Sequence, residues 1–187
     1  MGRFAELVAA REPAPGGGPV SAVTVSFAAA LVAMAARYSA QDAAGEGLVA
    51  AAEQLTSRAA DLADADSVAY RAVIAAYAST RDGEPELREE RIRSTMERAA
   101  TVALEIAKAG AEAATLATRL AVEGKPSIRG DAVTAVLLAE AATRSAAHLV
   151  ALNVDAGGCD ERLVRQAERS VEIAHAASSR ASRPPRS

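Results

Sequence analysis

The sequence predicts an all-α protein, built as a single-domain bundle of about six helices. Alanine, which has the highest helix propensity of all residues, supplies 50 of the 187 positions. No stretch alternates apolar and polar residues as a half-buried strand does. The 12 glycines and 7 prolines are few, and most of them gather between long helical stretches. Because 50% of the residues are hydrophobic, a chain of this length can bury one sizeable core.

The first three helices follow from these interruptions. Residues 4–10 predict a short helix, ended by Pro13 and Pro15. The next helix is expected over residues 19–39, and because it stays uncharged until Arg37 we expect it to be the buried central helix. A long third helix, residues 46–80, is closed by the stretch TRDGEP, which carries Asp-Gly and Pro turn signals.

Three more helices complete the predicted bundle. The fourth covers residues 86–122, and the loop EGKPSIRGD separates it from a fifth helix at residues 131–153. The stretch DAGG breaks the chain again before a sixth helix at residues 160–178. The predicted domain is therefore residues 1–178. Residues 179–187 are rich in Arg, Ser and Pro and predict a disordered tail.

Composition argues against several classes of function. A net charge of −3 and only 3% aromatic residues do not suit a phosphate backbone or stacked bases, so no nucleic-acid partner is expected. Glu172 and His175 form one Glu-x-x-His pair, whereas a di-iron bundle needs two, so no metal is expected. Cys159 is the only cysteine, which fits a reducing compartment.

The uncharged run in the second helix also passes for a membrane span by length. Ala, Ser and Thr fill much of it, however, and they contribute little to insertion. A signal peptide has a basic start, whereas Glu6 and Glu12 precede this run. We therefore expect a cytoplasmic protein without a membrane partner.

The third helix places one acidic residue on its apolar face. At 100° per residue, Leu55, Ala59 and Val73 lie within about 60° of Asp66, whereas Asp61 and Asp64 point away. An apolar setting raises the pKa of a carboxyl group, which makes Asp66 a candidate acid or base. The alternative is a structural carboxylate bonded to a neighbouring helix terminus or tyrosine.

The stretch APGGGPVS combines three glycines with the predicted start of the second helix. Residues Gly16, Gly17 and Gly18 have no Cβ, so their amides can approach a ligand beside the positive helix end that Pro19 begins. Ser21 places a hydroxyl just inside this helix. A plain hinge loop is the alternative.

Asp131 follows Gly130 at the predicted start of the fifth helix. The first interpretation is an N-cap, whose carboxylate accepts hydrogen bonds from first-turn amides. The second is a residue that faces the core, because Leu138, Ala142 and Leu149 lie on the same side of that helix.

Three motifs together resemble one known family. The PAPGGG entry to an alanine-rich helix, the segment LADADSVAY, and the Gly-Asp step that opens a helix ending in LVALNV are similar to the cyclodeaminase/cyclohydrolase family. That family contains the C-terminal domain of formiminotransferase-cyclodeaminase and stand-alone bacterial methenyltetrahydrofolate cyclohydrolases. The resemblance covers about residues 3 to 178.

The resemblance implies an all-α homodimer that acts on one-carbon tetrahydrofolates without a metal or other cofactor. The glycine loop of the family falls on Gly16, Gly17 and Gly18, and its catalytic aspartate falls on Asp66. The family's Ser-Asp step resembles Gly130-Asp131, which makes Asp131 the second catalytic candidate. The predicted substrate-binding residues outside the glycine loop are Ser21, Tyr70, Lys125 and Asn153. A homodimer also follows from composition, because so much alanine leaves apolar surface to cover.

Two questions of function stay open at this stage. A cyclohydrolase adds water to a methenyl bridge and a cyclodeaminase releases ammonia from a formimino group, and one carboxylate serves either reaction. Pro19, Lys125 and Leu149 depart from the family pattern around the expected pocket. The alternative is therefore a non-catalytic helical ligand-binding or scaffold protein that keeps the family fold.

Overall fold

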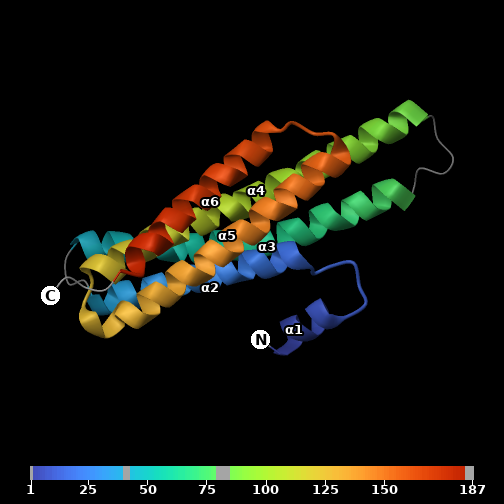
Figure 1. The fold of residues 1–187 in the computed structure, drawn as a ribbon. Helices are drawn as coiled ribbons and strands as arrows, with labels where there is room; N and C mark the ends of the chain where they lie inside the picture. Colours follow the sequence, from blue (N-terminus) through green and yellow to red (C-terminus); the bar gives the residue numbers. More distant parts are fainter. Residues whose placement is uncertain (1, 40–42, 79–84, 184–187) are drawn as a thin grey trace.

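The computed structural model describes residues 2–39, 43–78 and 85–183. Over these ranges the chain forms six α-helices and one 3-10 turn, and no strand. The elements are α1 (Gly2–Ala9), α2 (Gly17–Ser39), α3 (Ala43–Ala78), α4 (Pro85–Glu123), η2 (Pro126–Ile128), α5 (Arg129–Gly157) and α6 (Arg162–Ala181). The predicted all-α bundle of about six helices is confirmed (Figure 1).

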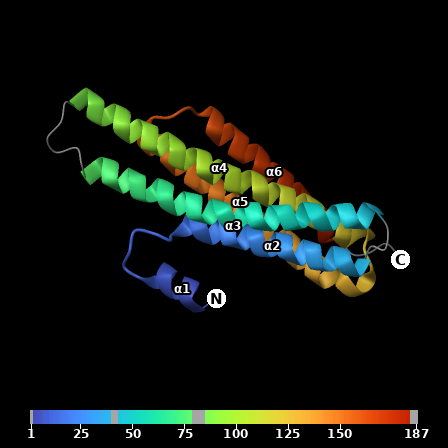
Figure 2. The ribbon, with the colours of Figure 1, turned by 180° about the vertical axis from the view of Figure 1, so that it is seen from behind.

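The helices α2 to α6 lie side by side along a common direction (Figures 1 and 2). Helix α2 packs on α3, α4 and α5, while α6 packs on α4 and α5. The core is mostly alanine, and its largest fully buried side chains include Leu55, Leu104 and Ile106. Small residues let helices approach closely: a Cβ at Gly110 of α4 would lie 2.3 Å from Thr143 Oγ1 of α5. Close backbone approach thus replaces large side chains in this core.

Helix α2 begins at Gly17, two residues before the predicted start at Pro19. Gly17 and Gly18 thus lie in the first turn, where the amide groups have no hydrogen-bond acceptor within the helix. The Val20 N–H then donates to the Gly16 carbonyl at 3.2 Å, which closes the first turn. Pro19 therefore lies within the first turn, where its missing N–H leaves no gap in the helix.

The fifth helix differs from the prediction at both ends. It begins at Arg129 with Ile128 as its N-cap, so the prediction of Asp131 as N-cap is wrong. Asp131 lies in the first turn and is exposed, which also contradicts the core-facing interpretation. A carboxylate at that position interacts favourably with the positive helix end. At the other end, the helix continues through Gly157 and stops at Gly158, which adopts the left-handed conformation with φ 58° and ψ 38°.

The two ends of the chain also differ from expectation. Helix α6 continues to Ala181, three residues into the predicted tail, and residues 184–187 lie outside the described part. Helix α1 has no buried residue and lies apart from the other helices in both views.

By length and composition α2 and the segment Pro126–Gly157 could cross a membrane. However, 56% and 39% of their respective apolar 18-residue stretches are buried in the bundle. Core helices of soluble proteins pass the same test.

Candidate functional site

A hollow of about 300 Å³ lies at the N-terminal end of α2. It is enclosed by the segment before α2, by the middle of α3, and by one turn each of α4 and α5. The lining residues are Pro13, Ala14, Gly16, Gly17, Gly18, Asp66, Tyr70, Ala99, Leu149, Leu152 and Asn153. Six of the residues predicted from the sequence therefore meet in one place: the three glycines, Asp66, Tyr70 and Asn153.

Among the described residues that line this hollow, Asp66 is the only acidic one. Leu55, Ala59 and Val73 are buried on its side of α3, as the helical period predicts, while Asp64 is exposed. Burial raises the pKa of the Asp66 carboxyl from 3.8 to about 6. Within the described residues, this carboxyl makes neither a hydrogen bond nor an ion pair. Asp66 is therefore a carboxylate that can take or give a proton near neutral pH.

Gly18 lies directly against the Asp66 carboxyl group. A Cβ built on Gly18 would lie 2.2 Å from Oδ2 and 2.3 Å from both Cγ and Oδ1 of Asp66. Any side chain at this position would overlap the carboxyl group, so the glycine is needed for close approach of α2 to α3. Gly17 has more room, because its nearest neighbour would be Leu149 Cδ1 at 3.9 Å, and at Gly16 nothing lies within 4 Å.

The first turn of α2 also contributes partial positive charge to the hollow. The amides of a first helical turn have no acceptor within the helix, and they point out of its positive end. Gly17 and Gly18 carry two of these amides, and both residues line the hollow. The site therefore combines a carboxylate on α3 with amide donors on α2, a pairing that suits a ligand with both cationic and carbonyl groups.

Apolar side chains from α4 and α5 form the rest of the wall. Ala99 is buried, and Leu149 and Leu152 come from the last turns of α5. Asn153 adds a polar amide side chain, and Tyr70 is 46% exposed at the edge. Sequence reasoning missed Ala99, Leu152 and the Pro13–Ala14 edge as wall residues. No local signal marks them, because the sequence pattern predicts an alanine or leucine on a helix to be a core residue whether or not it lines a cavity.

Three predicted site residues do not line the hollow. The Ser21 hydroxyl donates to the Gly17 carbonyl at 2.8 Å and lies 2.9 Å from Ser145 Oγ, so it joins α2 to α5 outside the lining. Lys125 and Asp131 are exposed at the opposite end of α5. At 1.5 Å per residue, Asp131 is about 27 Å along α5 from Leu149. One chain alone does not bring Asp131 to Asp66.

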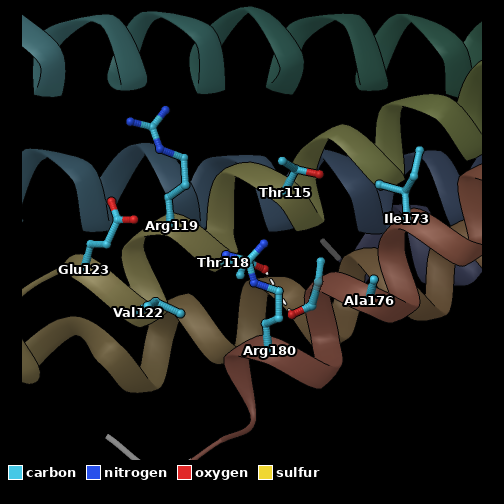
Figure 3. Close-up of a pocket in the computed structure, with 9 residues that line it drawn as sticks. Thr115, Thr118, Arg119, Val122, Glu123, Ile173, Ala176 and Arg180 are labelled. Atoms are coloured by element: carbon cyan, nitrogen blue, oxygen red, sulfur yellow. Dashed lines mark hydrogen bonds between the residues drawn. The ribbon is translucent and has the colours of Figure 1, made fainter. Parts of the chain in front are cut away.

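A second hollow, of about 280 Å³, lies between the C-terminal halves of α4 and α6 (Figure 3). Arg119, Glu123 and Arg180 line it, and none of the predicted site residues does. Their charged groups point to separate places and do not converge (Figure 3). The Thr118 hydroxyl, which bonds the Ala114 and Ala177 carbonyls, joins the two helices at its base. This hollow has the features of a packing groove between helices.

A metal would need several ligating side chains together. Over residues 2–39, 43–78 and 85–183, no group of three or more His, Cys, Asp or Glu side chains is placed to hold one. His175 Nδ1 lies 2.9 Å from Glu140 Oε1, but this pair joins α5 to α6 away from the hollow.

Comparisons with known proteins agree with this architecture. The sequence pattern of the family described as Formiminotransferase-cyclodeaminase matches residues 1–173. A methenyltetrahydrofolate cyclohydrolase of Methylorubrum extorquens is 31% identical over 179 residues, which cover 91% of this chain and 85% of that protein. The crystal structure of a formiminotetrahydrofolate cyclodeaminase from Thermotoga maritima superposes with a TM-score of 0.86 at 23% identity, over 97% of this chain and 92% of that one. Given a family match over nearly the whole length and a relative above 30% identity, this chain belongs to the formiminotransferase-cyclodeaminase family.

Proposed function

We propose that this protein is a methenyltetrahydrofolate cyclohydrolase in which Asp66 transfers the proton. The observation that carries the proposal is the Asp66 carboxyl itself, which faces an open hollow, has a pKa of about 6 because of burial, and lacks a partner among the described side chains. The cyclohydrolase relative at 31% identity supports the choice of substrate.

The substrate suits such a site. The methenyl bridge between N5 and N10 of methenyltetrahydrofolate is part of a delocalised cation, and a carboxylate without its own counter-ion would stabilise it. Above pH 6 the Asp66 carboxyl is mostly ionised, which is the form that attracts a cation and accepts a proton. The apolar wall from Leu149 and Leu152 lowers the local polarity and strengthens this attraction.

The proposed reaction moves protons and adds one water. The water oxygen bonds to the methenyl carbon while Asp66 takes one of its protons, giving a neutral hydroxylated bridge. The carbon–N5 bond then breaks, Asp66 returns its proton to N5, and the hydroxyl proton leaves to solvent as the formyl group forms on N10. The balance is one water consumed and one proton released, with no change of oxidation state.

The remaining residues bind the substrate in this proposal. The amides of Gly17 and Gly18 are donors for a pterin carbonyl, and the Asn153 side chain offers a further donor and acceptor. Tyr70 lies at the edge with 46% of its surface exposed, where its ring can flank the pterin. The apolar part of the substrate then covers surface that is now open to solvent.

Formiminotetrahydrofolate cyclodeamination is the second candidate activity. In that reaction N10 attacks the formimino carbon and ammonia leaves, so the same carboxyl group carries the proton to the leaving nitrogen. The likeness to the Thermotoga maritima cyclodeaminase concerns the fold, and Asp66 serves either chemistry. A non-catalytic binding protein is the remaining alternative, which the departures at Pro19, Lys125 and Leu149 suggest.

Two assays on three proteins test the proposal. The decay of methenyltetrahydrofolate absorbance is measured against the uncatalysed background, beside ammonia release from formiminotetrahydrofolate. We expect the wild type to accelerate the first reaction. Asp66→Asn keeps the shape and removes the base, so its rate should fall by about 10²- to 10⁴-fold. Asp64→Asn is the matched control. Asp64 lies two residues before Asp66 and is exposed, so this variant should keep the wild-type rate.

Each failure has a distinct meaning. A wild type that accelerates only ammonia release would make the protein a cyclodeaminase. A wild type that matches the background in both assays would leave the non-catalytic alternative. If the wild type is active and Asp66→Asn keeps its rate, Asp66 is not the proton-transfer group.

A further inference from the structure

Two contacts join the first turns of α2 to α5. The Ser21 hydroxyl lies 2.9 Å from Ser145 Oγ. One turn earlier on α2, a Cβ on Gly17 would lie 3.9 Å from Leu149 Cδ1. Because Leu149 comes one turn after Ser145, the two contacts pair residues four apart on helices that run in opposite directions. Together they fix how far the start of α2 slides along α5.

The Ser21 hydroxyl also forms a hydrogen bond within its own helix. Its Oγ lies 2.8 Å from the Gly17 carbonyl oxygen. A carbonyl oxygen can only accept, so Ser21 donates its single proton to Gly17. The proton in the contact between Ser21 and Ser145 therefore comes from Ser145. A chain of two hydrogen bonds thus runs from Ser145 on α5, through Ser21, to the Gly17 carbonyl.

The bond from Ser21 to its own helix is common, but its surroundings are not. Serine and threonine side chains on helices often donate to the carbonyl four residues earlier, as Thr24 does to the Val20 carbonyl at 2.8 Å. Ser21 differs from Thr24 because it is only 4% exposed and is linked to a second helix. A buried hydroxyl with both of these bonds made is a fixed part of the structure.

The chain of hydrogen bonds ends at a peptide group that lines the hollow. The Gly17 carbonyl and the Gly18 N–H belong to this one group, and both residues line the hollow. The Val20 N–H is bonded to the Gly16 carbonyl, and Pro19 has no N–H. The first-turn donors that no helix carbonyl occupies are therefore those of Gly17 and Gly18. A hydrogen bond to a peptide carbonyl polarises the group, which makes its N–H a stronger donor.

We propose that Ser21 is a positioning residue for the Asp66 site, which holds the first turn of α2 in register with α5 and strengthens the Gly18 N–H as a donor to the substrate. The inference rests on the proposed function, in which the amides of Gly17 and Gly18 bind a pterin carbonyl. The sequence predicted Ser21 to bind substrate, but Ser21 does not line the hollow. Its role is to act on the substrate through the Gly17–Gly18 peptide group.

The first experiment compares Ser21→Ala with Ser26→Ala in the cyclohydrolase assay. Ser26 is the matched control, because its hydroxyl donates to the Thr56 carbonyl at 3.0 Å and joins α2 to α3 away from the first turn. A neutral hydrogen bond corresponds to about 3- to 10-fold in an equilibrium constant. Ser21→Ala should therefore raise KM by about that factor and keep kcat within about twofold. Ser26→Ala should keep both parameters.

This comparison separates positioning from stability. Each variant loses one hydrogen bond between helices, so the urea midpoints should fall by similar amounts, whereas KM should rise only in Ser21→Ala. An unchanged KM in Ser21→Ala, or an equal rise in Ser26→Ala, overturns the proposal. Ser145 acts only through Ser21, so adding Ser145→Ala to Ser21→Ala should change KM no further. A further rise in the double variant overturns the chain of hydrogen bonds.

The second experiment needs no turnover. In protein labelled with heavy nitrogen at glycine, nuclear magnetic resonance identifies the Gly18 amide as the signal that Gly18→Ala lacks. Removing the hydrogen bond from the Gly17 carbonyl returns electron density to the Gly18 nitrogen, so its signal should move to lower frequency in Ser21→Ala. Thr24→Ala removes the same kind of bond from the Val20 carbonyl and should leave the Gly18 signal in place.

The two experiments fail in different ways. A Gly18 signal that stays in place in Ser21→Ala, or moves as far in Thr24→Ala, overturns the proposal whatever the kinetics show. If the signal moves as expected while the wild type has neither cyclohydrolase nor cyclodeaminase activity, the proposed function fails. The action of Ser21 on the Gly17–Gly18 peptide group then stands without it.

Discussion

Replacing Gly18 by alanine tests the contact between α2 and the Asp66 carboxyl group. The new Cβ would lie 2.2 Å from Oδ2 and 2.3 Å from Cγ and Oδ1, closer than any ordinary contact. The carboxyl group must therefore retreat by about 1 Å or more, because carbon and oxygen atoms attract only beyond about 3 Å. Helix α3 packs on both α2 and α4, so we expect the side chain of Asp66, rather than the helix, to move, by rotating toward the open hollow.

Two measurable effects follow from this displacement. A catalytic group moved by 1 Å typically loses about 10²-fold in rate. If Asp66 is the proton-transfer group of the proposed cyclohydrolase, the rate of Gly18→Ala should fall by about that factor. A carboxyl group that turns toward solvent is less desolvated, so its pKa moves from about 6 back toward 3.8. Stability should change by less than about 1 kcal/mol, since the helix propensity gained by alanine offsets the crowding.

The assay is the pH dependence of methenyltetrahydrofolate hydrolysis between pH 4.5 and 8, with the background subtracted at each pH. The wild type should gain activity as the pH rises through about 6, and Gly18→Ala should be slower with its midpoint at lower pH. Gly47→Ala is the control, because nothing lies within 4 Å of a Cβ at that exposed position of α3. A Gly18→Ala protein with the wild-type rate and midpoint would refute the importance of this contact.

Three further predictions concern stability, each measured by urea unfolding followed by circular dichroism. Asp66 has a higher pKa folded (about 6) than unfolded (3.8), so the folded state binds its proton more tightly and loses stability as the pH rises through this range. Asp66→Asn should therefore be more stable than wild type by about 1 to 2 kcal/mol at pH 7.5, after solvent screening is allowed for. At pH 4 the two proteins should be nearly equal in stability. The same stability difference at both pH values would contradict this prediction. Gly110→Ala should be destabilised by about 1 to 3 kcal/mol, because its Cβ meets Thr143 Oγ1 at 2.3 Å, and Gly110→Ala combined with Thr143→Ala should recover much of that loss. Leu104→Ala should cost about 2 to 5 kcal/mol, since Leu104 is only 2% exposed, whereas Leu152→Ala at 51% exposure should cost far less.

The sequence by itself determined the helices and the faces of α3. Helix content follows from local propensity, because 50 of the residues are alanine, the strongest helix former. The period of 3.6 residues also separates Asp66 from Asp64, because the direction of a side chain on a regular helix depends only on position. The exposed Asp64 and the half-buried Asp66 agree with that reasoning. The predicted starts at Pro19 and Asp131 were each two residues too late, because the residues of a first turn are compatible with several neighbouring start positions.

Only the tertiary structure decided which residues meet. The contact between Gly18 and Asp66 joins two helices, and the hollow adds Ala99 from α4 and Leu149 from α5. Alanine-rich faces are nearly uniform, so their sequence does not specify how far one helix slides along another. That register depends on a few close approaches, such as Gly110 against Thr143, which become visible only when both helices are in place. The separation of Asp131 from Asp66 within one chain has the same cause. The face of a helix on which a residue lies follows from its position in the sequence, but the end of the bundle at which it lies depends on how the helices pack.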